Sequence, residues 1–148
     1  DKTIHEFVES GKPLFGVCVG MQALLESSAE NDGVTCLGIL PGKVEYFGDD
    51  LSDMKSGDKL KIPHMGWNQV KQNIDHPMWH NISDNERFYF VHSYYTEPND
   101  KQFVAATCEY GIEFCVSLAK DNIFATQFHP EKSQNAGLTL LKSFAQQC

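Results

Sequence analysis

The sequence lacks the features that mark membrane, nucleic-acid-binding and secreted disulfide-rich proteins. No apolar run is long enough to cross a bilayer. No basic cluster offsets the 20 Asp and Glu, which outnumber the 12 Lys and Arg and give a net charge of −8. The five cysteines are odd in number, include no Cys-x-x-Cys pair and follow no secretion signal. We therefore expect a soluble cytoplasmic protein that binds neither nucleic acid nor a membrane.

The sequence also offers no convincing set of metal ligands. His76 and His80 are four residues apart, but Pro77 lies between them and no further ligands accompany them. We expect a solvated loop at this point, and we expect neither a metal nor a cofactor.

The chain does contain enough apolar residues for one core. Hydrophobic residues make up 41% of the 148 residues, which fits a single domain over residues 1–148. Residues 1–10 predict a helix, because Ile4, Phe7 and Val8 share one face, and a buried strand and a second helix follow. This order is typical of the middle of an alternating α/β domain. We therefore expect the domain to be incomplete at its N-terminus, with its first strands upstream.

The segment from Pro13 to Leu25 predicts a strand, a sharp turn and a helix, with Cys18 at the turn. Apolar residues before the turn suit a buried strand, and those from Met21 to Leu25 recur at helical spacing. Gly16 and Gly20 stand two residues to either side of the cysteine, where a strained strand-to-helix turn leaves no room for side chains. The dipole of a helix favours a thiolate at its N-terminus, so we predict a partly activated nucleophile.

The second half of the chain predicts several neighbouring strands. Residues 87–95 give the strongest strand pattern, and short turns separate three further strands at 103–110, 112–119 and 123–128. Strands joined by short turns favour an antiparallel or mixed portion of sheet late in the domain. A C-terminal helix is expected around Leu138, whose apolar neighbours recur at intervals of three.

His129-Pro130-Glu131 comes directly after the strand predicted at 123–128. Residues two apart in an extended chain point the same way, so the Glu131 carboxylate can orient the His129 ring. Pro130 cannot donate to a strand ladder, so the strand must end there. Cys18 and His129 then both follow the carboxyl ends of apolar strands, which is the edge where open α/β sheets bind ligands.

These groups suit acyl transfer through a thioester, which requires a thiolate, an imidazole and a carboxylate that holds the imidazole. The backbone N–H of Val19, the residue after the nucleophile, is the obvious first oxyanion donor. Gln22 lies one helical turn beyond Cys18 and could reach a substrate held over the sulfur. Each motif alone also has a structural reading: a buried cysteine in a glycine-rich turn, and a strand-ending turn with a surface ion pair.

Three segments together resemble the class I (triad) glutamine amidotransferases: Gly-Val-Cys-Val-Gly-Met-Gln (16–22), Phe-Val-His-Ser-Tyr (90–94) and Thr-Gln-Phe-His-Pro-Glu-Lys-Ser (126–133). Within that family, Ile-Pro-His-Met-Gly-Trp-Asn (62–68) and Tyr-Phe-Val-His-Ser-Tyr-Tyr (89–95) resemble glutaminase subunits of imidazole glycerol phosphate synthases. The resemblance covers essentially the whole chain. It implies an open, mostly parallel α/β sheet of flavodoxin-like type, flanked by helices and with an antiparallel portion.

The resemblance implies that glutamine is hydrolysed to glutamate and ammonia, with Cys18 as nucleophile, His129 as base and acid, and Glu131 as the orienting partner of His129. The residues implied to hold glutamine are Gly20, Gln22, Glu30 and the segment His92, Ser93 and Tyr94, the segment acting largely through its backbone.

The resemblance also implies a heterodimer with a (β/α)8-barrel cyclase subunit. That subunit would receive the ammonia and make imidazole glycerol phosphate in histidine biosynthesis. The residues that match positions near this partner are Trp67, Asn68, Tyr89 and Lys132. Core packing of Trp67 and Tyr89, and a solvent-facing charge at Lys132, are the structural alternatives.

The sequence departs from the family at its beginning. The family's domain carries further strands, a helix and a Pro-Gly-x-Gly loop before this segment, and that loop supplies the second oxyanion donor. We therefore expect the 148 residues alone to fold poorly and to be inactive as a glutaminase.

Two other functions remain open. One is another Cys-His-Glu amide hydrolase of the same fold, such as a γ-glutamyl hydrolase or the glutaminase of anthranilate synthase. Met21, where chorismate-family glutaminases usually carry His, argues against the latter. The other is a non-catalytic scaffold subunit, against which the intact set of Cys18, His129 and Glu131 weighs.

Overall fold

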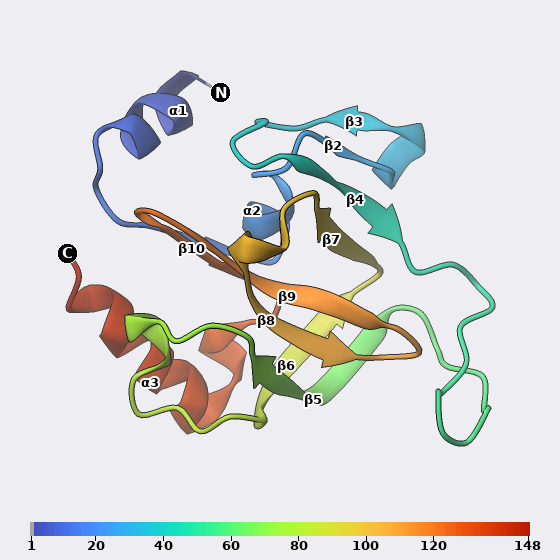
Figure 1. Cartoon of the computed structure of the whole chain (residues 1–148). Helices are drawn as coiled ribbons and strands as arrows, with labels where there is room; N and C mark the ends of the chain where they lie inside the picture. The colour runs from blue at the N-terminus through green and yellow to red at the C-terminus, as the bar shows by residue number, and fades with distance from the viewer. Residues whose placement is uncertain (1) are drawn as a thin grey trace.

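The computed structural model, which describes residues 2–148, is built on one mixed β-sheet (Figure 1). The helices are α1 (Lys2–Glu9), α2 (Val19–Gln22) and α3 (Gln134–Ala145). The strands are β1 (Leu14–Val17), β2 (Ser27–Ser28), β3 (Val34–Thr35), β4 (Gly42–Tyr46), β5 (His64–Gln72), β6 (Glu86–His92), β7 (Tyr94–Pro98), β8 (Val104–Glu109), β9 (Glu113–Lys120) and β10 (Ile123–Thr126). The short 3-10 helices are η1 (Glu30–Asp32), η2 (Pro77–Trp79), η3 (Lys101–Phe103) and η4 (Pro130–Lys132).

The sheet has ten strands, eight of them in the order β3-β2-β4-β7-β9-β8-β5-β6. β10 lies beside β9 and is antiparallel to it, and β1 lies beside β10 and is parallel to it. The only other parallel pair among the described strands is β2 with β4. The antiparallel portion expected late in the chain is confirmed, and among residues 2–148 it makes up most of the sheet.

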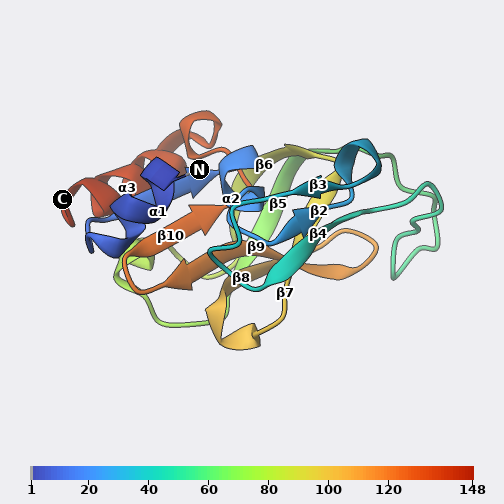
Figure 2. The ribbon, with the colours of Figure 1, turned by 90° about the horizontal axis from the view of Figure 1, so that it is seen from above.

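Helices α1 and α3 lie at the end of the molecule where β1 and β10 run, and the loop between β4 and β5 projects at the opposite end (Figures 1 and 2). Beneath the sheet lies a core rich in aromatic residues, each worth about 1.5–3 kcal/mol when fully buried. Its largest buried side chains include Phe88, Phe90, Phe124, Phe128 and Leu140. A second cluster beside α2 includes Met21, Leu25, Leu40, Val44 and Leu118.

Most predicted strands are confirmed within one to three residues at their ends. The first helix is confirmed from Lys2 to Glu9, with residue 1 of the prediction outside the described residues, and α3 confirms the helix expected around Leu138. The strand predicted over 87–95 is divided, because β6 ends at His92 and β7 begins at Tyr94. β6 pairs with β5, whereas β7 pairs with β4 and β9. The chain therefore has to change direction at Ser93, although its composition favours strand on both sides.

The helix after Cys18 is much shorter than its apolar spacing predicts. It ends at Gln22, and the carbonyl oxygens of residues 23–25 accept hydrogen bonds from the backbone N–H groups of residues 37–40. Those carbonyls are therefore not available to the next helical turn. The side chains of Met21, Leu24 and Leu25 are nevertheless buried, as their spacing indicates.

No helix among residues 2–148 is long and apolar enough to cross a membrane. The same residues contain no group of three or more His, Cys, Asp or Glu side chains arranged to hold a metal ion.

Candidate active site

Cys18 lies at a strained turn between β1 and α2. Its φ of 54° and ψ of −108° are unusual for a residue with a side chain and cost about 1–3 kcal/mol. Its N–H donates to the Thr126 carbonyl at 2.8 Å, which fixes the turn to β10. A Cβ at Gly16 would lie 3.2 Å from the backbone of Gly20, so the predicted close approach is confirmed there. A Cβ at Gly20 itself would meet nothing within 4 Å, so the steric reason predicted for that glycine is wrong.

The surroundings of Cys18 favour the neutral thiol. Burial raises the pKa of the Cys18 thiol, and the charge of Glu131 raises it further. The Val19 N–H, the Gln127 amide and the charge of Lys132 lower this pKa but do not offset the burial. The predicted partial activation of the thiol is not found, because burial outweighs the groups that favour the thiolate and the four-residue α2 supplies little dipole. The thiol therefore needs a base.

His129 and Glu131 form the pair that the sequence predicts. Nδ1 of His129 lies 2.7 Å from Oε1 of Glu131. The Glu131 side chain reaches His129 through the tight turn of η4, rather than by the alternation of an extended strand. Since an ionised carboxylate only accepts hydrogen bonds, Nδ1 carries the proton and Nε2 has the free lone pair. Nε2 is buried and has no hydrogen-bond partner among residues 2–148, so it is available as a base.

The two candidate groups lie on the same edge of the sheet. β1 and β10 are parallel and in register from Leu14 with Ile123 to Val17 with Thr126. Cys18 and His129 both follow the carboxyl ends of these strands, as predicted. Nε2 of Gln127, two residues before His129, lies 3.5 Å from the Cys18 sulfur, so the two halves of the site are in contact through this side chain.

Backbone contacts hold the His129 turn against β6. The His129 N–H donates to the Tyr89 carbonyl at 2.9 Å. The Ser133 hydroxyl accepts from the Tyr89 N–H at 2.9 Å and donates to the His129 carbonyl at 2.6 Å. Ser133 is 1% exposed, and its role in holding this turn is not among the sequence-based predictions. Its position in the Lys-Ser pair after His-Pro-Glu was the available signal.

A cavity of about 350 Å³ is lined by Val19, the residue after Cys18, and by Gln22 and Glu30. Its other lining residues are Ala23, Ser28, Val34, Thr35, Cys36 and Leu37. The lining includes neither the predicted catalytic residues Cys18, His129 and Glu131 nor Gly20 and the segment 92–94. Tyr94 nevertheless contributes through its carbonyl, which accepts a hydrogen bond from Nε2 of Gln22 at 3.2 Å.

Gln127 joins the two sides of the site and was not predicted. Its side chain is fully buried, its Oε1 accepts from Nε2 of Gln22 at 3.0 Å, and its Nε2 lies 3.5 Å from the Cys18 sulfur. Both amide hydrogens of Gln22 are therefore used, by Tyr94 and by Gln127. Oε1 of Gln22 remains as the acceptor for a ligand.

The four residues predicted near a partner do not form one surface. Trp67 and Tyr89 pair across β5 and β6 with ring centroids 5.9 Å apart, and Trp67 is 43% exposed. Lys132 is exposed in η4, immediately after Glu131. Asn68 points to the other face of β5, because successive strand residues alternate, and it contacts His64 and Glu109 instead.

The sequence of this chain is similar to those of known proteins. Residues 2–148 match the sequence model of the family described as Glutamine amidotransferase class-I. The chain is 60% identical over 147 residues to imidazole glycerol phosphate synthase subunit HisH of Acinetobacter baylyi, covering 99% of this chain and 68% of that protein. It is 55% identical over 144 residues to subunit HisH 1 of Pseudomonas aeruginosa, covering 97% and 66%. The chain thus spans about two thirds of the length of these relatives.

Solved structures are similar in fold. A glutamine amidotransferase from Thermotoga maritima has a TM-score of 0.62 at 17% identity, covering 98% of this chain and 52% of that one. The glutaminase domain of Trypanosoma brucei CTPS has a TM-score of 0.55 at 18% identity, covering 92% and 61%. At such identities the likeness concerns the fold, and it confirms the predicted α/β class.

Proposed function

Because the chain belongs to the class I glutamine amidotransferase family, we propose that it hydrolyses glutamine to glutamate and ammonia through a thioester on Cys18. The observation that carries this proposal is the arrangement of Cys18 and the His129–Glu131 pair on one edge of the sheet, next to a cavity. A glutamine held by Gln22 and Glu30 at the wall of that cavity would extend its amide carbon past Val19 to the Cys18 sulfur.

In the first half of the reaction, Nε2 of His129 takes the thiol proton and the sulfur attacks the amide carbonyl carbon. The backbone N–H of Val19 donates to the oxygen that becomes negatively charged. The C–N bond then breaks, and His129 gives its proton to the leaving nitrogen, which departs as ammonia. Glu131 stabilises the imidazolium that exists between these two steps, since its carboxylate accepts from Nδ1.

In the second half, the same ring takes a proton from water, which attacks the thioester carbon. The C–S bond breaks, glutamate leaves, and Cys18 regains its proton. Gln22 and Glu30 orient glutamine from the cavity wall. Gly20, His92, Ser93 and Tyr94 act mainly through backbone groups, and the Tyr94 carbonyl does so by holding Gln22.

We further propose that the ammonia passes to a (β/α)8-barrel cyclase subunit, which uses it to make imidazole glycerol phosphate in cytoplasmic histidine biosynthesis. The support is that the similar HisH proteins are named as subunits of that synthase. The exposed Trp67, its neighbour Tyr89 and the cation of Lys132 supply an apolar and charged surface for this partner. Asn68 lies on the face of β5 opposite Trp67, so it would support this surface from the other side of the strand.

The test is glutamate release by the protein in complex with the cyclase subunit. Cys18→Ser should lower the rate by at least about 10³-fold, because the nucleophile is removed. Cys148→Ser is the matched control, since Cys148 is exposed and lies at the end of α3, and it should leave the rate within twofold. A Cys18→Ser complex that keeps normal turnover would rule out the thioester mechanism and favour a scaffold.

A second experiment addresses what the 148 residues can do alone. β1 pairs with β10 along one edge and with no other strand of residues 2–148, and its four residues are only partly buried. We propose that a chimera carrying the preceding segment of the Acinetobacter baylyi relative would cover this edge. It should release glutamate in the presence of the cyclase, and the 148 residues alone should not. Equal activity of the two proteins would contradict this expectation.

A further inference from the structure

A buried line of hydrogen bonds leads away from the candidate active site between β5 and β6. His64 and His92 stand opposite each other in the register of these strands and are 3% and 6% exposed. Nδ1 of His64 lies 2.9 Å from Nε2 of His92, and Nδ1 of His92 lies 2.8 Å from the Tyr94 carbonyl oxygen. Neither side chain is used in the mechanism described above.

The positions of the hydrogens in this line follow from the Tyr94 carbonyl at one of its ends. The Tyr94 carbonyl can only accept, so Nδ1 of His92 carries the hydrogen and donates. Burial lowers the pKa of His92 to about 4 and that of His64 to about 3, so both rings are neutral near pH 7. A neutral ring has one donor, and therefore Nε2 of His92 accepts from Nδ1 of His64. Nε2 of His64 must in turn accept, and Asn68 lies next to it.

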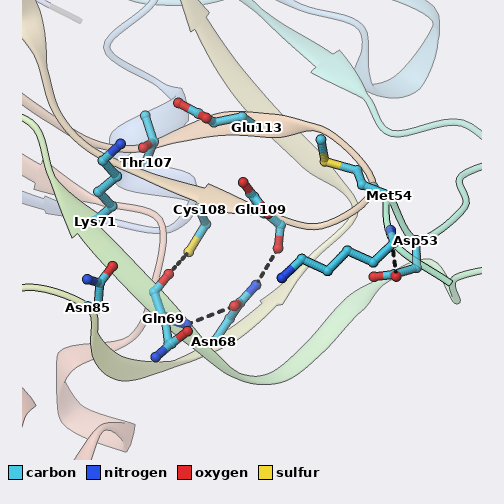
Figure 3. Close-up of a pocket in the computed structure, with 12 residues that line it drawn as sticks. Asp53, Met54, Asn68, Gln69, Lys71, Asn85, Thr107, Cys108, Glu109 and Glu113 are labelled. Atoms are coloured by element: carbon cyan, nitrogen blue, oxygen red, sulfur yellow. Dashed lines mark hydrogen bonds between the residues drawn. The ribbon is translucent and has the colours of Figure 1, made fainter.

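At the far end the line reaches a second cavity. Nδ2 of Asn68 lies 3.3 Å from Nε2 of His64 and 2.8 Å from the Glu109 carbonyl oxygen, and Oδ1 of Asn68 accepts from the Gln69 N–H at 2.8 Å. These contacts fix the orientation of the amide. Asn68, Gln69 and Glu109 line a polar cavity of about 360 Å³, in which Figure 3 shows the bond from Asn68 to Glu109.

At the near end the line reaches the nucleophile. The Tyr94 carbonyl that accepts from His92 also accepts from Gln22, whose second amide hydrogen goes to Gln127. Gln127 in turn donates toward the Cys18 sulfur. Each hydrogen donated in this series therefore has one acceptor. The hydrogens from Asn68 to Cys18 can be assigned in one consistent way.

We propose that Asn68, His64 and His92 are positioning residues for the glutaminase reaction. They fix the Tyr94 carbonyl and, through Gln22 and Gln127, orient both the glutamine-binding amide and the thiol. This proposal rests on the proposed function of Cys18. Its consequence is that the polar cavity of Figure 3 is connected to the nucleophile by a continuous series of hydrogen-bonded residues.

The first test is kinetic and uses the complex with the cyclase subunit. His64→Ala breaks the line and should lower kcat/KM for glutamine by about tenfold, and Asn68→Ala should lower it by about fivefold. His64→Gln retains a neutral donor and should recover most of the loss. Gln69→Ala is the control for the cavity wall, because its side chain takes no part in the line, and it should stay within twofold.

The variant Val70→Ala distinguishes a purely structural role of His64 from a positioning role. Val70 is 1% exposed on the same strand, so this variant loses stability without touching the line. Thermal unfolding of Val70→Ala and His64→Ala should show comparable losses, whereas only His64→Ala should lose kcat/KM. Equal kcat/KM losses in the two variants, or no loss in His64→Ala, would overturn the proposal.

The second test is spectroscopic. Imidazole ¹⁵N spectra of the complex should show the Nδ1–H tautomer at both His64 and His92. Covalent labelling of Cys18 with a glutamine-analogue electrophile should then shift the signals of both rings, whereas His76, which lies outside the line, should not respond. Labelling without any response of His64 and His92 would overturn the positioning role alone. A failure to label Cys18 would overturn the proposed function and this inference with it.

Discussion

Nδ1 of His129 lies 2.7 Å from Oε1 of Glu131, and Nε2 of the same ring is buried with no hydrogen-bond partner among residues 2–148. One nitrogen is thus committed to a carboxylate, and the other keeps its lone pair. A buried polar atom without a hydrogen-bond partner costs free energy, so this nitrogen calls for an explanation. In the proposed mechanism it accepts the proton of Cys18, whose pKa is raised by burial.

Glu131→Gln should lower kcat for glutamine hydrolysis by about 10²-fold or more and change KM little. A neutral amide does not stabilise the imidazolium, although it still accepts a hydrogen bond. The measurement is steady-state glutamate release by the complex with the cyclase subunit. Glu6→Gln, a carboxylate on the exposed face of α1, is the control and should behave as wild type. Unchanged kcat in Glu131→Gln would show that the carboxylate has no catalytic part.

Lys132→Gln should make the Cys18 thiol a weaker acid, because the charge of Lys132 lowers the pKa of that thiol. Alkylation by iodoacetamide follows the thiolate fraction, so its pH midpoint should move to higher pH and the rate at pH 8 should fall by about twofold. Lys142→Gln is the control, because it removes a cation on α3 instead of the cation beside Glu131. If both variants shift the midpoint equally, the effect is one of net charge rather than of position.

The parts of the site that the sequence predicts are those set by a few neighbouring residues. The turn at Cys18 depends on Gly16, and the pairing of His129 with Glu131 depends on one tight turn, so both could be inferred from short motifs. The same holds for the apolar strands before them. Their alignment on one edge required only that β1 and β10 be parallel neighbours.

The parts that were missed depend on contacts between distant segments. The helix after Cys18 ends early because the carbonyl oxygens of residues 23–25 accept hydrogen bonds from the backbone N–H groups of residues 37–40. Nothing in the sequence of the helix itself indicates this. Gln127 and His64 are polar residues among apolar ones, and their partners are defined by strand register. The small dipole of α2 follows from the same early end, whereas the pKa of Cys18 is raised by burial, which also depends on distant segments.

Gly137→Ala should disturb the His129 turn from the side of α3. A Cβ at position 137 would lie 2.7 Å from the carbonyl carbon of Pro130 and closer still to its oxygen, so either η4 or α3 has to move. Alanine is the better helix former by about 1 kcal/mol, yet the overlap should cost about 1–3 kcal/mol of stability. Chemical denaturation should therefore give a lower midpoint, and kcat should fall because His129 and Glu131 flank Pro130.

Thr139→Ala is the matched control, since residue 139 lies on the same helix and is only partly buried. It should change the denaturation midpoint and kcat only slightly. A Gly137→Ala protein that is more stable than wild type and fully active would mean that helix propensity outweighs the contact with Pro130.

The buried pair His64 and His92 should make the stability of the protein fall as the pH falls below about 6.5. Unfolded histidine has a pKa near 6.5, whereas burial holds the pKa of His64 at about 3 and that of His92 at about 4. Between these values the unfolded chain binds protons that the folded chain does not, so stability is fully present above pH 6.5 and is lost on acidification. Each ring contributes up to about 1.4 kcal/mol per pH unit.

His64→Gln removes one of these two groups and should roughly halve the part of the pH dependence that the pair causes. The measurement is the free energy of unfolding by urea at pH 7.5 and at pH 5 for both proteins. His76, whose pKa burial also lowers, is present in both and cancels from the comparison. The difference between the two pH values should be about 2 kcal/mol smaller in His64→Gln, which is 1.4 kcal/mol per unit over the 1.5 units from pH 6.5 to pH 5. Equal differences in the two proteins would show that His64 is already protonated in the folded state, and the hydrogen pattern from Asn68 to Tyr94 could not then be the one described.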